Sequence, residues 1–520
     1  MLSKISLVKL ISITLILITC LISISAKSCA KRANNTKTGS SNSNTFTINA
    51  PSNLTATTVS PFQVNLTWQN NANNADGFEL ERSANAVNYT LIVTLSTNTN
   101  SYSDSGLISL TTYYYRIRCF NTIGDKSSWS NAVSIYLSPV WSTIMAGLSH
   151  TLALTTDGTV WSWGLNDAGQ LGLGDSTFAN RTTPSLITSD NNWNAFTNVS
   201  AISAGNTHNV ALKIDGTIWS WGNNGIGQLG LGDTNSADVP TQIGVYSVNS
   251  DGFPILISAD SDWAQTASGF AYNLGRKTNN TLWSWGNNDS GQLGLGDSGT
   301  YRITPTSVGT DSNWTQITVG YYHSIGIKNN PAGGGTLWSW GRNNLGELGL
   351  GDSGIIRVTP TQIWADSDWS QSAAGFYHTL AIKTNNTLWA WGQNLPAGQL
   401  GDGTTTNRTT PREIGTASDW SQVYAGKFHS LGIKTGNTLW SWGYNAFGQL
   451  GLGYTNPLGS PVTTPTQIGT DSDWNTVAVC EFHTLGIKAD NTLWSWGTNI
   501  NGQLGLGDTF DRWTPALIGN

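Results

Sequence analysis

Hydrophobic and polar residues follow two different patterns along this chain of 520 residues. Between residues 50 and 139, short stretches such as Val64-x-Leu66-x-Trp68, Phe78-x-Leu80 and Tyr113-x-Tyr115-x-Ile117-x-Cys119 place every second residue on one face. This alternation is typical of half-buried β-strands, and residues 70–77 and 121–126 carry the turn residues between them. The pattern predicts a small β-sandwich.

From residue 140 onward, one unit recurs seven times. Each copy contains Trp-Ser-Trp-Gly or Trp-Ala-Trp-Gly, and the first tryptophans lie 51 to 64 residues apart: Trp161, Trp219, Trp283, Trp338, Trp389, Trp440 and Trp494. A repeat of this length indicates a solenoid, a propeller or an array. Because small sheets with two apolar faces must stack on copies of themselves, the units are predicted to close into a seven-bladed β-propeller over residues 140–520.

Each unit is predicted to be an antiparallel sheet. A tryptophan such as Trp141 opens most units and stands nine residues before a histidine; in the second unit Trp193 stands fifteen residues before His208, which predicts an insertion. Turn pairs such as residues 157–158 and 385–386 tolerate the positive φ of a two-residue hairpin. The glycines of Gly-Gln-Leu-Gly permit close approach to a neighbouring strand. Residues 514–518 are predicted to pair near Trp141 and close the ring.

The repeat resembles a known family. The shared pattern is Gly-x-x-His, Leu-Lys, Trp-Gly-x-Asn and Gly-Gln-Leu-Gly, and it resembles the regulator of chromosome condensation repeat across all residues from about 140 onward. This resemblance implies a seven-bladed β-propeller. It also implies two modes of action known in the family, which are nucleotide exchange on a small GTPase and, in secreted members, inhibition of an enzyme by one propeller face.

Residues 50–139 resemble a fibronectin type III domain, an immunoglobulin-like β-sandwich. Residues 51–56 are similar to its first strand, Trp68 to its buried tryptophan, Tyr113 to the tyrosine of its corner, and residues 129–133 to its last strand. Such domains act as spacers or as adhesive modules, and fold alone does not decide between the two roles. Because no Arg-Gly-Asp tripeptide is present, a spacer is the preferred interpretation.

The first 30 residues are typical of an export signal. Lys4 and Lys9 precede an uncharged apolar stretch, and small residues follow it. A membrane-spanning helix is the alternative, because the stretch is close to the lower length limit for crossing a bilayer. Cys20 or Cys29 is a candidate lipid attachment site. Residues 31–49 are predicted to form a flexible Asn/Ser/Thr linker. The mature protein is therefore expected to be extracellular, on the cell surface or periplasmic, with membrane contact only through the N-terminal anchor.

Composition argues against several functional classes. Only 11% of the residues are charged and the net charge is −6, so there is no basic face for nucleic acid. Cys119 and Cys480 stand alone in different domains, which predicts small buried hydrophobes rather than a disulfide. The glycine run lacks a following Lys-Ser or Lys-Thr, so it is not interpreted as a phosphate loop. No catalytic residue, metal or cofactor is predicted.

Two sets of polar residues recur in register. All six histidines occupy one position of the repeat, and Tyr272 replaces them in the third unit: His150, His208, His323, His378, His429 and His483. They are predicted to be structural, each hydrogen-bonded within its blade. An Asp ends most glycine runs and an Arg follows it: Asp175, Asp233, Asp297, Asp352, Asp402 and Asp508, with Arg181, Arg302, Arg357, Arg408 and Arg512. The sixth unit has lost both, which favours an ion pair within each blade over an exposed ring of arginines.

One set of positions varies while staying rich in aromatic residues. The two residues between the Gly and the His of each unit supply Phe270, Tyr321, Tyr322, Phe376, Tyr377, Phe428 and Phe482. If they crown one face, they form a protein-binding hot spot; packing between blades is the alternative. The insertion from Gly244 to Asp260, with Tyr246 and Phe253, is a second exposed candidate.

The sequence thus predicts an exported, non-catalytic, monomeric protein that uses a propeller face to bind a protein partner. One alternative is a guanine-nucleotide exchange factor like the namesake of the repeat family, although no residue stands out as one that would eject a nucleotide. A carbohydrate-binding or adhesive surface protein is the other. An enzyme such as a polysaccharide lyase or hydrolase is disfavoured, because no pair of carboxylates stands at a distinctive, non-repeated position.

Overall fold

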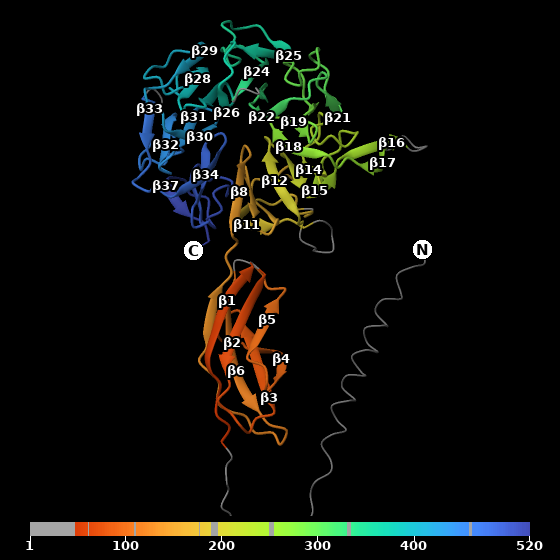
Figure 1. Cartoon of the computed structure of the whole chain (residues 1–520), viewed down its shortest axis with the longest axis vertical. Coiled ribbons are helices and arrows are strands. Elements are labelled where there is room, and N and C mark those ends of the chain that lie inside the picture. The colour runs from red at the N-terminus through yellow and green to blue at the C-terminus, as the bar shows by residue number, and fades with distance from the viewer. Residues whose placement is uncertain are drawn as a thin grey trace, which may run out of the picture.

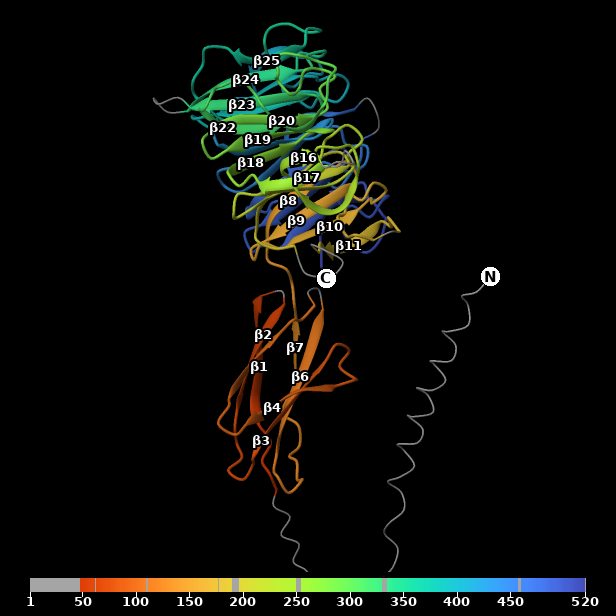
Figure 2. The same ribbon diagram turned by 90° about the vertical axis from the view of Figure 1, so that its right-hand side faces the viewer.

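A computed structural model describes residues 47–60, 62–108, 111–175, 177–188, 196–248, 254–329, 334–456 and 460–519. The predicted export signal and most of the predicted linker lie outside these residues. Every regular element within the described ranges is a β-strand, and none of them holds a helix able to cross a membrane. Figure 1 shows a narrow β-sandwich standing below a wide disc, and Figure 2 shows the two bodies from the side.

The sandwich contains two antiparallel sheets, β1-β2-β5 and β4-β3-β6-β7. Its strands are β1 (Ser52–Ser60), β2 (Gln63–Gln69), β3 (Gly77–Ser83), β4 (Thr90–Ser96), β5 (Ser101–Ser105), β6 (Thr112–Phe120) and β7 (Val133–Tyr136). Burial alternates along β2 and β6, as the sequence pattern predicted. Inward residues of both sheets therefore form one core.

The markers of the sandwich are mostly where the sequence placed them. Trp68 is buried and packs edge-on against Phe78, with ring centroids 5.6 Å apart. The hydroxyl oxygen of Tyr113 accepts a hydrogen bond of 2.9 Å from the backbone N–H of Ile108. The predicted last strand at residues 129–133 is wrong, because the strand begins only at Val133. Trp129 instead stacks on arginine side chains of β6.

The disc is a seven-bladed β-propeller of four-stranded antiparallel blades, in which a single pairing of Gly335 with Trp369 also links blades 4 and 5 (Figure 1). Within each blade, the strands are given in order from the innermost to the outermost. Blade 1 has β8 (Trp141–Ala146), β9 (His150–Thr155), β10 (Val160–Gly164) and β11 (Arg181–Leu186), and blade 2 has β12 (Val199–Ala204), β13 (His208–Lys213), β14 (Ile218–Gly222) and β15 (Ala237–Gln242). Blade 3 has β18 (Trp263–Ser268), β19 (Tyr272–Lys277), β20 (Leu282–Gly286) and β21 (Arg302–Ser307), and blade 4 has β22 (Trp314–Val319), β23 (His323–Asn329), β24 (Gly335–Gly341) and β25 (Arg357–Ile363). Blade 5 has β26 (Trp369–Ala374), β27 (His378–Lys383), β28 (Leu388–Gly392) and β29 (Arg408–Glu413). Blade 6 has β30 (Trp420–Ala425), β31 (His429–Lys434), β32 (Leu439–Gly443) and β33 (Val462–Gln467), and blade 7 has β34 (Trp474–Val479), β35 (His483–Lys488), β36 (Leu493–Gly497) and β37 (Arg512–Leu517).

Each blade is built around its tryptophans. In blade 1 the rings of Trp161 and Trp163 both pack edge-on against Trp141, at centroid distances of 6.1 and 6.3 Å. Ser162 points to the other face and donates a hydrogen bond of 2.6 Å to the carbonyl oxygen of Leu171. The hairpin turns have the predicted positive φ, for example +62° at Asn386. Alternation along the Trp-x-Trp strand thus gives each blade one bulky face and one thin face.

The Gly-Gln-Leu-Gly loop links each blade to the next. A Cβ on Gly172 would lie 2.8 Å from the indole of Trp221 in the following blade, so only glycine fits there. At the last seam, the carbonyl oxygen of Gln503 accepts hydrogen bonds of 2.9 Å from Thr151 and from the indole of Trp163. Blade 7 is therefore bonded to blade 1, and the ring is closed.

Two expectations about the ends of units need correction. The C-terminal segment does not pair beside Trp141, because β37 is the outer strand of blade 7 and pairs with β36; only the side chain of Ile518 shares a cluster with Trp141. In blade 2 the inner strand begins at Val199, and Phe196 packs against Trp219 and Trp221 in place of an opening tryptophan. Trp193 lies outside the described residues.

Candidate protein-binding face

The histidines at the seams are fully buried, and they join neighbouring blades. Nε2 of His150 lies 2.8 Å from Oδ1 of Asn209 in blade 2, and Nε2 of His378 lies 2.8 Å from Oγ of Ser430 in blade 6. At the ring closure, Nε2 of His483 lies 3.4 Å from Oγ1 of Thr151. The prediction of hydrogen bonds within one blade is wrong. Each histidine is hydrogen-bonded to a side chain of the next blade, and that side chain belongs to the residue directly after the histidine position there.

The hydrogen-bond partners of these histidines determine which ring nitrogen carries the proton. The hydroxyl of Ser430 donates to the carbonyl oxygen of Gln399, so its oxygen accepts from the Nε2–H of His378. Nδ1 of every histidine is buried without a hydrogen-bond partner among the described residues. Burial lowers the pKa of His150 and His208 to about 4, and the pKa of the other four histidines to about 3. The histidines are therefore neutral structural groups at pH 7.

The predicted Asp–Arg pairs are confirmed. Nη2 of Arg302, Arg357 and Arg512 lies 2.7, 2.5 and 2.6 Å from the carboxylate of Asp297, Asp352 and Asp508. Arg181 also pairs with Asp175, and Arg408 with Asp402.

Asp402 was nevertheless assigned to the wrong position of the repeat. In other blades the Asp carbonyl oxygen accepts from a loop asparagine, as Asp352 does from Asn343 at 3.2 Å. In blade 5 that acceptor is the carbonyl oxygen of Thr404, 2.9 Å from Nδ2 of Asn394. Thr404 therefore takes the usual aspartate position, and Asp402 stands two residues earlier, where the other blades have leucine.

The variable residue pairs lie on one face of the propeller, at the end of each inner strand. Their loops are tied across the seams by backbone hydrogen bonds, such as Asn206 N–H to the carbonyl oxygen of Phe270 at 3.2 Å. The loop after each Trp-x-Trp-Gly joins the same face, because the N–H of Arg342 donates to the carbonyl oxygen of Tyr322 at 2.9 Å. We call this side the histidine-loop face.

Nine rings on this face form a continuous cluster across blades 3 to 7. We call it the aromatic arc, and it consists of Phe270, Tyr321, Tyr322, Phe376, Tyr377, Phe428, Tyr444, Phe447 and Phe482. Tyr321 stacks on Phe270 at 4.1 Å between centroids and contacts Phe376 at 4.6 Å. At the other end, Phe447 lies 4.9 Å from Phe482. The predicted residues thus come together and also pack on one another between blades.

Charged groups within the aromatic arc are covered or paired. The guanidinium of Arg342 lies 5.9 Å from the ring of Tyr322 and 5.1 Å from that of Tyr377. The ammonium of Lys427 lies above three rings, those of Phe376, Phe428 and Phe482, and pairs with Glu481. Burial raises the pKa of Tyr321 and Tyr322, so both phenols are neutral at pH 7. Two cations, Arg342 and Lys427, thus accompany the rings of the aromatic arc.

The sequence analysis missed the residues that the second loop adds. Tyr444 and Phe447 belong to the loop after Trp-Ser-Trp-Gly in blade 6, and Leu395 and Ile500 occupy similar loops in blades 5 and 7. Leu395 is 59% exposed and Ile500 is 74% exposed, which makes them prominent apolar groups on this face. Variation within the otherwise constant Trp-Gly-x-Asn-x-x-Gly loop was the signal that could have identified them.

The aromatic arc does not extend round the whole ring. Blades 1 and 2 contribute Leu148, Ser149, Asn206 and Thr207 at the equivalent positions. The second candidate, the insertion after blade 2, forms a hairpin of β16 (Gly244–Val248) and β17 (Pro254–Ala259) that projects from the disc (Figure 1). The backbone of Tyr246 lies in β16, and Phe253 is outside the described residues. The prediction that Tyr246 and Phe253 form a binding site therefore stays a prediction.

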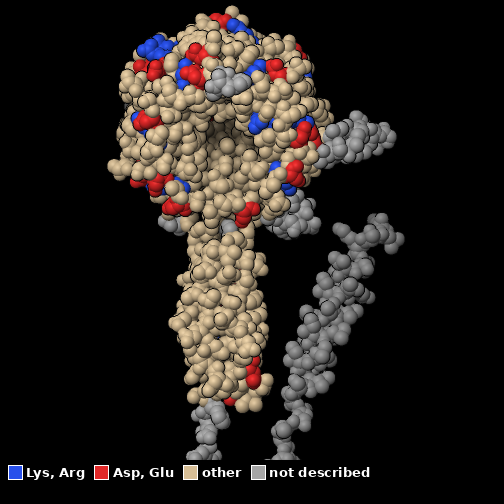
Figure 3. All heavy atoms as spheres, in the orientation of Figure 1, with Lys and Arg blue, Asp and Glu red and all other residues tan. Residues whose placement is uncertain are grey.

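A hollow runs along the axis of the propeller, and Figure 3 shows its opening on one face. Inner-strand residues line a cavity of about 380 Å³ there. On the histidine-loop face, Phe270, Tyr321, Phe376 and Cys480 border a smaller cavity of about 100 Å³. Burial raises the pKa of the Cys480 thiol to about 12, so it is protonated. The described residues contain no group of three His, Cys, Asp or Glu placed to hold a metal ion.

The fold defines a β-propeller built from repeats of about fifty residues. The model of the RCC1-like domain matches residues 257–520, and models of the regulator of chromosome condensation (RCC1) repeat match residues 157–212 and 215–259. The fibronectin type III model matches residues 49–136. The chain belongs to the RCC1-like domain family and carries an N-terminal fibronectin type III domain.

Relatives cover the propeller to different extents. The chain is 31% identical to the ultraviolet-B receptor UVR8 of Arabidopsis thaliana over 72% of this chain and 81% of the receptor. It is 29% identical to the mitochondrial RCC1 domain-containing protein RUG3 of the same plant, over 59% of this chain and 66% of that protein. It is 28% identical to the human probable E3 ubiquitin-protein ligase HERC6 over 50% of this chain and 26% of the ligase.

Solved structures show the same fold. Prp20p from Saccharomyces cerevisiae superposes with a TM-score of 0.56 at 23% identity, over 68% of this chain and 84% of that one. Human WBSCR16 gives a TM-score of 0.57 at 20% identity, over 69% of this chain and 94% of that one. At these identities the likeness extends to the fold alone.

Proposed function

We propose that the protein is an exported, non-catalytic binding protein that holds a partner protein against the aromatic arc. The supporting observation is the arc itself, which brings nine aromatic rings from five blades onto one face. Aromatic residues and arginine are the residue types enriched at the energetic centres of protein interfaces. Both are present, with Arg342 between Tyr322 and Tyr377.

Preorganisation favours this use. The rings of the aromatic arc are held by each other and by short loops that are hydrogen-bonded across the seams. Because few rotamers would be lost on binding, the entropy cost of association is small. The partial burial of the rings leaves Leu395, Phe447 and Ile500 as the groups that project to meet a partner.

The site of action is part of the proposal. Residues 1–30 have the charge and hydropathy pattern of an export signal, and residues 31–49 supply a polar tether. The fibronectin type III domain then serves as a spacer between the tether and the propeller. A protein partner outside the cytoplasm fits this order of segments.

Capture of partners tests the proposal. The purified chain is immobilised and exposed to the extracellular and envelope proteins of the source organism, and bound proteins are identified by mass spectrometry. We expect the variant Leu395→Ser/Phe447→Ser/Ile500→Ser to lose at least 90% of the specific capture, because it removes the projecting apolar groups.

The matched control is Phe510→Ser, which removes a side chain that is 72% exposed in blade 7 and is not part of the aromatic arc. It should retain capture, and both variants should keep the melting temperature of the wild type. Equal capture by the wild type and the triple variant would rule out the arc as the binding surface.

A further inference from the structure

Blade 5 departs from the repeat at the seam with blade 6. In the other six blades a leucine follows Gly-Gln-Leu-Gly or Gly-Glu-Leu-Gly: Leu173, Leu231, Leu295, Leu350, Leu452 and Leu506. Each of these leucines belongs to the hydrophobic cluster that contains the first tryptophan of the next blade's Trp-x-Trp strand. The cluster between blades 5 and 6 contains Trp440 without such a leucine.

Asp402 takes the place of that leucine. The following glycine keeps the usual contact, because the N–H of Gly403 donates to the carbonyl oxygen of Thr463 at 2.9 Å, just as Gly351 does to Thr409 at 2.8 Å. The backbone path is therefore the same in blades 4 and 5. The difference between the two seams lies in the side chains.

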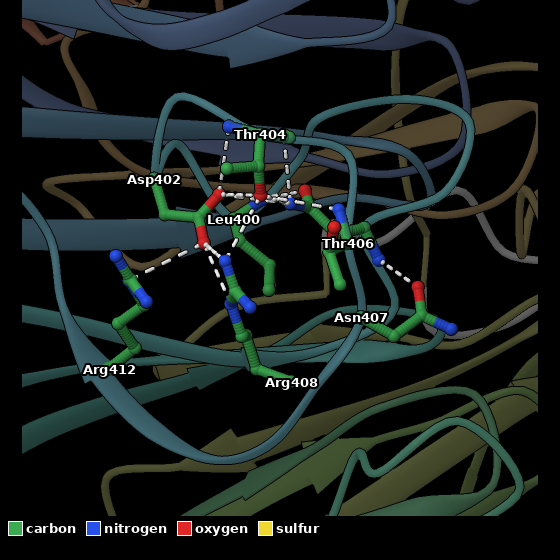
Figure 4. Close-up of polar contacts among 8 residues, drawn as sticks. Leu400, Asp402, Thr404, Thr406, Asn407, Arg408 and Arg412 are labelled. Carbon is green, nitrogen blue, oxygen red and sulfur yellow. Dashed lines mark hydrogen bonds and ion pairs between the residues drawn. The ribbon is translucent and has the colours of Figure 1, made fainter.

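The carboxylate of Asp402 points towards Arg408 and Arg412 (Figure 4). Its Oδ2 accepts from Nε and Nη2 of Arg408 at 2.8 and 2.6 Å, and lies 3.5 Å from Nε of Arg412. Its Oδ1 accepts from the N–H and hydroxyl of Thr404 at 3.0 and 2.6 Å. Although burial raises its pKa, the hydrogen bonds from Thr404 and Arg408 together hold that pKa below the usual value.

A cavity of about 520 Å³ opens at this seam. Its lining includes Asp402, Arg412, Glu413, Trp420, Lys434 and Trp440. The volume lies within the range of about 300–1,000 Å³ that is usual for small-molecule sites. Replacement of a leucine by a smaller side chain that points elsewhere explains why the space is open.

Two of the polar lining residues are also peculiar to this blade. The position of Arg412 holds Ser, Thr or Ala in the other blades, and the position of Glu413 holds Leu, Gln or Ser. Arg412 is 53% exposed at its side chain, and its Nη groups make no hydrogen bond to the described residues. Three departures from the repeat thus converge on one cavity. Asp402 also pairs with Arg408 as the usual aspartate does in other blades, whereas Arg412 and Glu413 have no counterpart elsewhere in the repeat.

We propose that this cavity binds a neutral pyranose ring of a carbohydrate. A pyranose presents an apolar face of C–H groups, which suits an indole, and a rim of hydroxyls that both donate and accept. Trp440 supplies the part of its aromatic surface that Lys434, 4.6 Å from its ring, leaves uncovered. Arg412 supplies the free donors and Glu413 an acceptor. Asp402 is paired with Arg408 and Lys434 with Asp419, which leaves Arg412 and Glu413 as one basic and one acidic group. The charges therefore match a neutral ligand better than an ion.

Ligand-observed NMR and calorimetry with glucose, galactose, mannose and N-acetylglucosamine test the site on the full chain. We expect saturable binding of at least one sugar with a Kd of about 1 mM or tighter. The double variant Asp402→Leu/Thr404→Asp restores the residues of the other blades, so it fills the cavity and keeps a partner for Arg408. It should weaken binding at least tenfold, as should Arg412→Thr.

The matched control is Thr361→Ala, which changes the position equivalent to Arg412 in blade 4 and should leave sugar binding unchanged. Capture of a protein partner by the aromatic arc should be unaffected by all of these variants, so the two proposals fail separately. Absence of saturable binding for all four sugars would overturn the proposal. Undiminished binding by the folded double variant would overturn it as well.

Discussion

At the scale of single residues, the seams depend on a few buried polar groups. One carbonyl oxygen in the loop of each blade accepts from a side chain of the next blade, as the carbonyl of Glu347 does from Thr379 at 3.0 Å and from the indole of Trp391 at 3.0 Å. Thr379 in turn accepts from His323. Because buried polar groups without partners are costly, this arrangement makes correct pairing of blades a condition of stability.

The buried histidines make stability depend on pH. Their folded pKa values, about 3 to 4, lie below the value of about 6.5 expected in the unfolded chain. The unfolded chain therefore binds protons first as the pH falls, and stability that is complete above about pH 6.5 is lost towards pH 4. We expect the free energy of unfolding to fall by several kcal/mol between pH 7 and pH 5, measured by urea denaturation.

The six histidines dominate the change expected between pH 6.5 and pH 5. Glu347, whose pKa is raised by burial, acts in the opposite direction as a single group. Carboxyl groups whose pKa is lowered by hydrogen bonds, such as Asp215 beside Thr217, remain largely ionised there in both states. A free energy of unfolding that is constant from pH 7 to pH 5 would contradict the burial of neutral histidines.

At the scale of elements, the loop between the third and fourth strands is the connector of the ring. It carries glycines at positive φ whose hydrogen atoms face the indole of the next blade. Other glycines of the same loop have positive φ but face open space. The glycines that face an indole set the distance between blades. The glycines that face open space are needed only for the backbone conformation of the turn.

Two glycines of blade 3 separate these roles. Gly294 has φ of +74°, and a Cβ there would lie 2.8 Å from the indole nitrogen of Trp340; Gly299 has φ of +80° and no atom within 4 Å. We expect Gly299→Ala to cost about 1 kcal/mol, since only backbone strain is added. Gly294→Ala should cost about 2–4 kcal/mol because the seam must also open. Chemical denaturation measures both, and equal costs would show that the contact with Trp340 has no effect on stability.

At the scale of the whole molecule, the two domains touch at blade 1. A lysine caps the tryptophans in blades 2 to 7, as Lys328 does at 3.6 Å from the ring of Trp338. Blade 1 has Thr155 at that position, and Trp161 is only 4% exposed. Phe62 of the sandwich packs against the cluster that contains Trp161. The sandwich thus covers the part of blade 1 where the other blades have a lysine.

Removal of this contact should loosen the joint between the domains. We expect Phe62→Ala to broaden the distance distribution measured by small-angle X-ray scattering, because Phe62 is the sandwich residue packed in the cluster of Trp161. Val59→Ala, at an exposed side chain of β1, should leave the scattering unchanged. Identical curves for Phe62→Ala and the wild type would mean that the contact does not restrain the domains.

Much of the fold was predictable from local pattern. The repeats predicted seven blades, positive φ at Asn386 and its equivalents, and the Asp–Arg pairs, because each of these depends on residues close in sequence. The alternation of residues 113–119 likewise predicted β6 of the sandwich. The site was predictable only in part, since the residue pairs before each histidine were found while Tyr444 and Phe447 were not.

The sequence by itself determined the repeat, the strands and the residue types that face inward, because spacing and alternation are local properties. Only the tertiary structure decided which blade each side chain or strand contacts. His378 bonds across a seam, β37 pairs within its own blade, and Asp402 leaves a cavity against Trp440. The physical reason is that these outcomes depend on contacts between units about fifty residues apart, and a periodic sequence does not distinguish a partner in the same unit from one in the next.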